Sequence, residues 1–272
     1  MMRLGIIAGN RLLPLILAKK IRETNKDNEV IAICFKGETS PLINRYVTKT
    51  HWVQPTKLGQ LKEALKKENL KECIMAGQIN PLRIFKRSQW DQELRSLVAQ
   101  TQDFRPHTIF TAIINHLQTE GIKFLDSTLY LKESLAQQGL MDNLDLDSNV
   151  KKDIDFGVEI ISRFVELDVG QVGVVKSNTV AALESLEGTD RTIKRGFSLA
   201  GRGCTVLKFS KANQDLRFDV PVVGISTLRL LKKINAASLV LEKEKVIILE
   251  KEKFLSHATR WGIPVVGRER VK

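Results

Sequence analysis

Two neighbouring stretches decide the fold class of this chain. They are Arg3–Gly9, RLGIIAG, and Leu12–Glu23, LLPLILAKKIRE. The first run is short, apolar and closed by Gly9, which is typical of a buried strand. The second run has the spacing of an amphipathic helix. A strand, a tight turn and a helix in this order favour a helix-covered parallel sheet over a secretory leader, because Asn10 and Arg11 interrupt the apolar stretch.

The same alternation continues through the first half of the chain, where apolar runs of strand type are separated by helical patterns. We therefore expect a Rossmann-like parallel-sheet domain over residues 1–138. The expected strands are 29–35, 51–53, 72–77 and 123–126, and the expected helices are 58–70, 88–100, 107–121 and 129–139.

An acidic, polar stretch that begins at Gly139 breaks this rhythm, so we place a linker at 139–150. The remainder, 151–272, predicts a mixed α/β domain. Its clearest features are a hairpin turning at Ser177–Asn178 and a helix at 189–201 with Thr189 as its N-cap.

The composition is that of a soluble globular protein, with 43% apolar and 27% charged residues in a chain of 272. The three cysteines form no CxxC pair, which favours a reducing compartment and argues against structural zinc. No apolar run approaches the length needed to cross a bilayer, and we expect a cytoplasmic protein.

The net charge of +12 would attract nucleic acid, anionic lipid or a phosphorylated metabolite. Nucleic acid is disfavoured, because aromatic residues are only 6% of the chain and no basic stretch is interleaved with them. Charge alone does not choose between lipid and metabolite.

The turn after the first strand lies where a nucleotide-binding fold holds phosphate, but it lacks the GxGxxG pattern. The second strand ends in Phe35–Lys36 instead of an acidic residue, so an NAD-dependent dehydrogenase is disfavoured. The strand ends Ala8–Gly9 and Ala76–Gly77 nevertheless match, and their small residues would let a ligand approach the backbone. The alternative is that the two glycines are needed only for tight turns. The candidate substrate contacts there are Gly9, Asn10, Gly77 and Gln78.

The second half gathers carboxylates from three separate stretches without any histidine or cysteine cluster, which suits Mg²⁺ bound together with substrate phosphate. The first two stretches are ELDVGQVGVVK (166–176) and ESLEGTD (184–190). The polar residues that they supply are Asp168, Gln171, Glu184, Glu187, Thr189 and Asp190.

The third stretch, QDLRFDVPVVG (214–224), alternates charged and apolar residues with the period of a strand. Asp215, Arg217 and Asp219 are its candidate catalytic residues. A straight strand would separate the two aspartates by roughly 13 Å, so one ion could not hold both without a bend. The alternative is a solvated strand face with weak ion pairs.

These segments together resemble the LpxI-type UDP-2,3-diacylglucosamine pyrophosphatases of lipid A biosynthesis. The resemblance runs through the whole chain in order, and its most specific part is the DVGQ…EGTD…QDLRFDVP series. One departure stands at Asn10 and Arg11, where members often have a further glycine.

The resemblance implies a Rossmann-like domain, a C-terminal catalytic domain and substrate in the crevice between them. It also implies Mg²⁺-dependent hydrolysis of UDP-2,3-diacylglucosamine to UMP and 2,3-diacylglucosamine 1-phosphate. Carried over residue by residue, the resemblance implies that the catalytic aspartate is Asp215 or Asp219. It also implies Asp168, Glu187 and Asp190 as metal ligands and Gln171 and Thr189 as substrate contacts. Peripheral attachment to the inner membrane and a homodimer are hypotheses, and a non-catalytic sugar-nucleotide or lipid-binding protein of the same fold is the alternative.

Overall fold

The computed structural model describes residues 2–80, 86–212 and 214–271 and divides the chain into two units. The first unit runs to Leu131 and also takes in Leu216–Phe218. The second consists of Lys132–Asp215 and the chain from Asp219 onward. The division thus falls ahead of the linker expected at 139–150. The reason lies in backbone pairing, because the N–H of Ala136 already bonds to Val246 of the second unit (3.0 Å).

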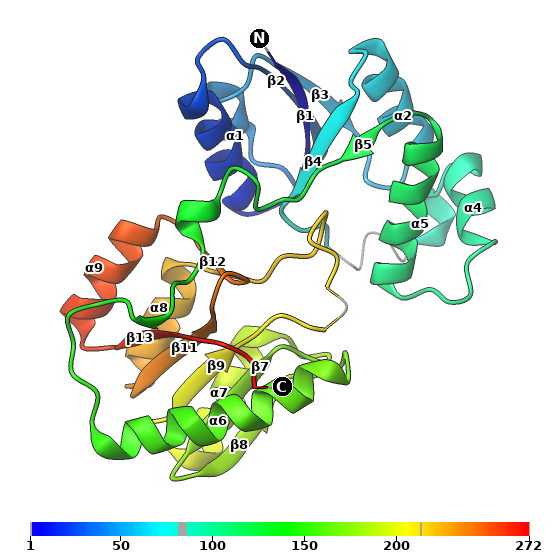
Figure 1. Cartoon of the computed structure of the whole chain (residues 1–272). Coiled ribbons are helices and arrows are strands. Elements are labelled where there is room, and N and C mark those ends of the chain that lie inside the picture. Colours follow the sequence, from blue (N-terminus) through cyan, green and yellow to red (C-terminus); the bar gives the residue numbers. More distant parts are fainter. Residues whose placement is uncertain (1, 81–85, 213, 272) are drawn as a thin grey trace. The chain divides into compact units, whose positions relative to one another are not determined.

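The first unit contains one parallel sheet in the order β3-β2-β1-β4-β5 (Figure 1). This is the strand order of a Rossmann-like half, with the chain reversing direction across the sheet between β1 and β4. The strands are β1 (Arg3–Ala8), β2 (Glu29–Phe35), β3 (Lys49–Val53), β4 (Glu72–Ala76) and β5 (Lys123–Phe124).

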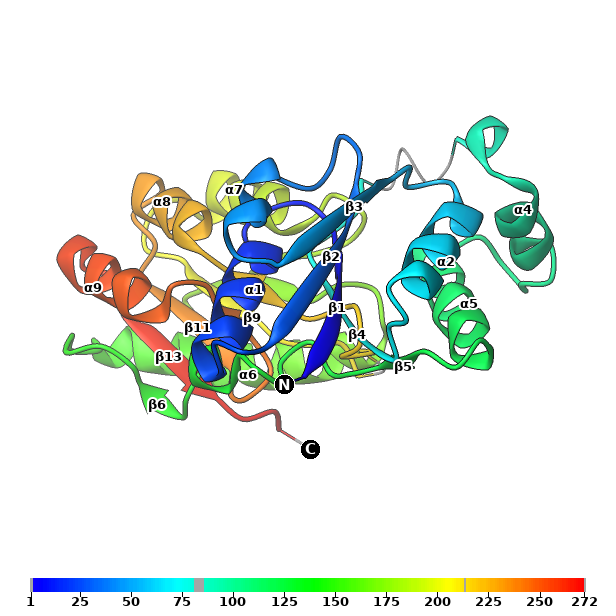
Figure 2. The same cartoon turned by 90° about the horizontal axis from the view of Figure 1, so that it is seen from above.

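Helices cover both faces of this sheet, with α1 on one side and α2, α4 and α5 on the other (Figures 1 and 2). The second group encloses the main apolar cluster of the unit, which includes Ile7, Leu61, Leu94 and Leu117. Burying each of these side chains contributes about 1.5–3 kcal/mol. The helices are α1 (Leu13–Thr24), α2 (Leu58–Lys67), α4 (Gln92–Val98) and α5 (Pro106–Thr119), with short 3-10 turns at Pro41–Arg45 and Arg87–Gln89.

Glu68, buried at the end of α2, is the centre of an ion cluster in the first unit. Its carboxylate lies 2.5 Å from Lys49 Nζ, 2.7 Å from His51 Nε2 and 2.8 Å from Arg3 Nη2. The hydrogen bond from Lys49, helped by the one from His51, holds the pKa of Glu68 at about 2 against its usual 4.5.

We expect the stability that Glu68 contributes to be complete above pH 4.5 and to be lost as the pH falls to about 2, since the unfolded chain binds the proton first. The free energy of unfolding of Glu68→Gln should therefore differ most from wild type above pH 4.5 and converge with it below. Urea unfolding at a series of pH values measures this, with exposed Glu63→Gln as the matched control. If wild type and Glu68→Gln differed in their free energy of unfolding by the same amount at every pH between 2 and 5, this role of Glu68 would be contradicted.

The second unit contains a mixed sheet in the order β6-β13-β11-β9-β7-β8, in which β9, β11 and β13 are parallel and β7 is antiparallel to both neighbours. A separate two-stranded pair, β10 with β12, is also parallel. The strands are β6 (Gly139–Leu140), β7 (Val172–Lys176), β8 (Thr179–Leu183), β9 (Thr205–Lys208), β10 (Val222–Val223), β11 (Ser238–Glu242), β12 (Ile247–Ile248) and β13 (Val265–Arg268).

Successive residues of these strands pack into two clusters on opposite faces. Val206 and Leu239 belong to the cluster under α7, α8 and α9, whereas Leu207 and Val240 belong to the cluster under α6. This two-sided burial explains why the strands are almost wholly apolar. The helices are α6 (Ser148–Glu166), α7 (Thr189–Ala200), α8 (Ile225–Lys233) and α9 (Lys251–Trp261), with a 3-10 turn at Lys132–Ser134 (Figure 2).

Two local predictions are confirmed and two are wrong. Ser177 and Asn178 form the hairpin turn, each with φ of 52°, and Gly201 (φ 74°) ends α7. The helix expected at 129–139 is absent, because this segment pairs with β12 and β13 instead. Thr189 is not an N-cap, because Gly188 (φ 80°) holds that position and Thr189 is the first helical residue. Among the described helices, none is long and apolar enough to cross a bilayer.

Candidate active site

In the first unit, the loops after β1 and β4 meet at the point where the strand order reverses. In open α/β sheets this is where ligands bind. Asn10 N–H donates to the carbonyl of Gln78 (2.7 Å), and a Cβ on Gly9 or on Gly77 would come within 2.4 Å of the opposite loop's backbone. The close approach of the two loops is by itself sufficient reason for both glycines.

Asn10 supplies the polar group of this edge. Its Nδ2 donates to Glu38 Oε2 (2.7 Å), and Glu38 also accepts from the backbone N–H of Asn80 (3.3 Å). The other side-chain atom, Oδ1, is buried and has no hydrogen-bond partner among the described residues. A buried acceptor without a partner is costly, and a ligand donor would satisfy it.

The second unit gathers polar side chains at the edge of its sheet where β8 and β9 end. Glu184 is buried there and accepts the Gln171 backbone N–H (3.0 Å) and the Thr189 hydroxyl (3.2 Å). Lys208 Nζ donates to that same hydroxyl oxygen (3.3 Å). The structure thereby brings two predicted contact residues, Gln171 and Thr189, together with a buried lysine.

Asp168 stands in a tight turn beside this group. It has a φ of 57°, and Lys211 Nζ lies 3.5 Å from its Oδ1. Gly170 in the same turn lies against Glu184, so that a Cβ would meet the Glu184 carbonyl oxygen at 2.2 Å. Gln171 Oε1 is a second buried acceptor without a partner among the described residues. A buried acceptor without a partner favours a ligand that supplies a hydrogen-bond donor here.

Glu187 and Asp190 differ in their surroundings. Glu187 Oε1 contacts Arg195 (2.5 Å) and Thr192 (3.2 Å), and the Arg195 hydrogen bond lowers the Glu187 pKa to about 2. Asp190 is exposed in the first turn of α7. Within the described ranges, no three histidine, cysteine or acidic side chains are grouped so as to hold a metal ion. The metal roles of Asp168, Glu187 and Asp190 therefore stay predictions.

The stretch 214–224 is not the strand that its alternation predicts. Leu216–Phe218 form a turn, and the Asp219 N–H donates to the Asp215 carbonyl (2.9 Å), so four residues advance about 6 Å instead of about 13 Å. Only Val222–Val223 are strand. The turn thus supplies the bend that a shared role for the two aspartates requires.

Contacts within the first unit explain why this segment turns. The Leu216 carbonyl accepts the Ser127 N–H (2.9 Å), and the Ser127 hydroxyl lies 3.0 Å from the Arg217 carbonyl. Phe218 packs on the apolar cluster beneath α5. Arg217 Nη1 donates to Gln118 Oε1 (2.9 Å), which orients the guanidinium.

Sequence analysis missed Lys208 and Glu242, which are both buried. Glu242 accepts the Ser210 N–H (2.6 Å), and Arg270 Nη2 lies 3.2 Å from its Oε1. Each is a charged residue that closes a buried apolar strand, and this is the signal that could have found them, because such positions lie at the carboxyl edge of a parallel sheet.

The fold is that of a two-unit α/β protein with a polar edge on the sheet of each unit. Residues 3–134 match the model of the LpxI N-terminal domain and residues 137–266 match that of the LpxI C-terminal domain. The chain belongs to the LpxI family. It is similar to UDP-2,3-diacylglucosamine pyrophosphatase LpxI of Caulobacter vibrioides, with 24% identity over 98% of each chain.

Proposed function

We propose that this protein hydrolyses the diphosphate of UDP-2,3-diacylglucosamine, releasing UMP and 2,3-diacylglucosamine 1-phosphate. The chain belongs to the LpxI family, and one structural observation supports the proposal. The turn at 215–219 holds Asp215 and Asp219 one helical turn apart. Phosphoryl transfer needs groups that position water and neutralise phosphate charge, and carboxylates with nearby basic side chains supply both.

In the proposed reaction, Asp215 or Asp219 takes a proton from a water molecule while the oxygen of that water attacks phosphorus. The bridging P–O bond breaks, and its electron pair goes to the oxygen of the leaving phosphate. Lys208, which donates to Thr189 (3.3 Å), and Arg217, oriented by Gln118 (2.9 Å), neutralise phosphate charge. Gln171 Oε1 accepts from a hydroxyl or amide group of the substrate.

The donor set fits Mg²⁺. This ion usually takes one or two carboxylates and completes its shell with water and substrate phosphate, so a cluster of three acidic side chains is not required. One of Asp215 and Asp219 would hold the ion while the other takes the proton from water, and Asp168, Glu187 and Asp190 are the further proposed ligands. When bound, the ion would polarise the phosphoryl oxygens. The alternative, a protein of this fold that binds the sugar nucleotide without turnover, predicts binding with intact substrate.

We further propose that the protein attaches to anionic membrane surfaces through two loops of the second unit. Leu167, Val169 and Leu186 are 70%, 52% and 103% exposed. The loops adjoin, because Gly170 lies against the Glu184 backbone. Neighbouring exposed apolar side chains mark interaction surfaces, and the chain's net charge of +12 favours anionic lipid.

Flotation with phosphatidylglycerol vesicles at low salt tests this attachment. We expect the wild type to float, and the double variant Leu167→Asp/Leu186→Asp to stay at the bottom, because charge replaces the side chains that would enter the interface. The control Leu199→Asp, on another exposed leucine of the same unit, should float. Wild type that remains unbound, or a double variant that floats equally well, would contradict the attachment.

A further inference from the structure

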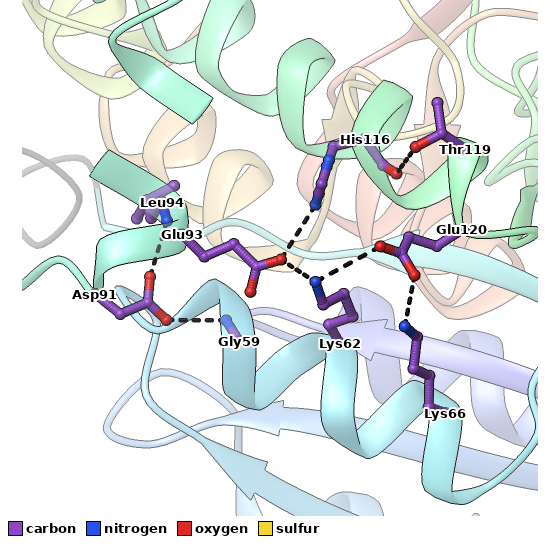
Figure 3. A network of polar contacts seen from close by, with 9 residues as sticks. All are labelled: Gly59, Lys62, Lys66, Asp91, Glu93, Leu94, His116, Thr119 and Glu120. Atoms are coloured by element: carbon purple, nitrogen blue, oxygen red, sulfur yellow. Dashed lines mark hydrogen bonds and ion pairs between the residues drawn. The ribbon is translucent and has the colours of Figure 1, made fainter. Parts of the chain in front are cut away.

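Networks of charged side chains connect separate elements in both units. One network of the first unit ties α2, α4 and α5 to one another (Figure 3). It comprises Lys62, Lys66, Glu93, His116 and Glu120. A network of the second unit differs in kind, because it holds the segment that follows β9. That segment leads from Lys208 to Asp215, two residues proposed to act on the substrate, so this network bears on the chemistry.

Ser210 is buried just after β9, and its backbone and side-chain polar groups are all hydrogen-bonded. Its N–H and its hydroxyl both donate to Glu242 Oε2, over 2.6 Å and 2.5 Å. Its carbonyl accepts from Arg270 Nη2 (2.5 Å), and the same guanidinium lies 3.2 Å from Glu242 Oε1. Hydrogen bonds to ionised groups are roughly twice as strong as those between neutral groups. One ion pair thus holds Ser210 by its N–H, its hydroxyl and its carbonyl.

Hydrogen bonds transmit the position of Ser210 to Asp215. The N–H of Lys211, the next residue, donates to Gln214 Oε1 (2.8 Å). The N–H of Gln214 donates in return to the Lys211 carbonyl (3.3 Å), and Gln214 directly precedes Asp215. A shift of Ser210 would therefore move the start of the turn that carries the two proposed catalytic aspartates.

The segment after β9 is also bonded to the turn at 165–171. These bonds run from the Phe209 N–H to the Gln171 carbonyl (2.9 Å) and from the Ala212 N–H to the Val165 carbonyl (3.3 Å). Glu242, by contrast, is the last residue of β11 and joins the segment to the sheet itself. Arg270 is the cation that compensates this buried carboxylate. The sheet therefore fixes the segment through a contact that depends on Arg270.

We propose that Arg270 is a positioning residue for the hydrolysis, an inference that rests on the proposed function. Through Glu242 and Ser210 it keeps the segment after β9 in place at the carboxyl edge of the sheet. Without Arg270 the buried carboxylate would lose its cation, so Glu242 would turn toward water and release Ser210. Arg270 lies beyond residues 137–266, which match the LpxI C-terminal domain model, so this contact is made by a residue outside the matched region.

Truncation of Arg270 tests this role. In Arg270→Ala, kcat for UMP release should fall by about tenfold to a hundredfold, because a misplacement of about 1 Å can cost about 10²-fold. KM should change by less than about threefold, since the substrate binds through other groups. Arg270→Lys keeps the charge but not the fork that reaches both Glu242 and Ser210, so its kcat should lie between those of Arg270→Ala and wild type. It takes the place of Arg270→Ala if that variant does not fold.

Arg268→Ala is the matched control, because Arg268 lies two residues earlier and pairs with the exposed Asp155. Its kcat should stay within about twofold of wild type, as expected for a surface ion pair. Guanidinium chloride, well below denaturing concentrations, should raise kcat of Arg270→Ala several-fold by occupying the vacated place. It should leave kcat of Arg268→Ala unchanged. A general loss of stability would not produce this rescue.

Hydrogen–deuterium exchange separates the position of the segment from the chemistry. The backbone amides of Phe209, Ser210 and Ala212 should exchange faster in Arg270→Ala than in wild type or Arg268→Ala. Equal exchange rates, wild-type kcat in Arg270→Ala, or a loss of kcat that guanidinium does not restore would each overturn the proposal. If wild type released no UMP, the proposed function would be wrong, whereas selectively faster exchange in Arg270→Ala would still support Arg270 as the residue that holds this segment.

Discussion

Asp215→Asn and Asp219→Asn are each expected to lower kcat for UMP release by roughly 10²–10⁴-fold, the usual effect of removing a general base. Asparagine keeps the shape of the side chain but neither accepts the proton of the attacking water nor carries the charge that a cation needs. The turn itself should persist, because it is closed by backbone groups, the Asp219 N–H and the Asp215 carbonyl.

This expectation separates a chemical role from a structural one. The melting temperatures of both variants should stay close to that of wild type, and KM should change far less than kcat, because the substrate binds through other groups. Asp145→Asn, the same substitution at an exposed position of the second unit, is the control and should keep full activity. If both turn variants retained more than a third of the wild-type kcat, the assignment of the chemistry to this turn would be wrong.

Gly170→Ala is expected to reduce the free energy of unfolding by about 1–3 kcal/mol, the usual cost of forcing extra atoms into a packed site. The new Cβ would lie 2.2 Å from the Glu184 carbonyl oxygen and 2.7 Å from its carbon, and neither backbone atom can move independently of β8. The turn carrying Asp168 must then shift away from Glu184, which weakens the Gln171 N–H to Glu184 hydrogen bond.

Urea unfolding measures this cost. Gly224→Ala is the matched control, because its Cβ would meet no atom of the described residues closer than 3.5 Å and its backbone is extended. We expect that control to stay within about 1 kcal/mol of wild type, in the range of ordinary substitutions. Equal unfolding midpoints for Gly170→Ala and wild type would show that the loop moves freely, which would remove the argument that Glu184 fixes the position of Gln171.

Local pattern was sufficient to predict the parallel sheet of the first unit. The run Leu4–Ala8 is apolar at every position except Gly5, and its short length together with the turn at Gly9 favours a strand covered on both faces. The hairpin at Ser177–Asn178 also followed from the local pattern of two apolar runs joined by two polar residues, and both residues have the positive φ of a type I′ turn.

The elements that escaped prediction are those fixed by distant partners. In the stretch 214–220, Phe218 packs on the apolar cluster of the first unit. Ser127, about ninety residues earlier, donates hydrogen bonds to the backbone carbonyls of Leu216 and Arg217 and so holds the turn. The expected helix at 129–139 failed for the same kind of reason, since Val246 accepts the Ala136 N–H. Tertiary hydrogen bonds override local propensity in both segments.

The candidate site was predictable in its residue types but not in its geometry. Sequence analysis placed Gln171 and Thr189 among the contact residues, yet their common partner, the buried Glu184, became evident only from the structure. Lys208 was missed because sequence analysis searched the apolar strands for their core residues and did not consider the charged residue that closes each of them. Its burial and its hydrogen bond to Thr189 give it a place in the site.

The most direct test of the central claim is ³¹P NMR of UDP-2,3-diacylglucosamine incubated with purified protein, with Mg²⁺ and with EDTA. We predict that the two diphosphate resonances disappear in the Mg²⁺ sample and are replaced by two phosphomonoester resonances, UMP and 2,3-diacylglucosamine 1-phosphate, and that EDTA prevents the change. Diphosphate resonances that persist in the presence of Mg²⁺, although the substrate binds, would contradict the claim that this protein is a pyrophosphatase.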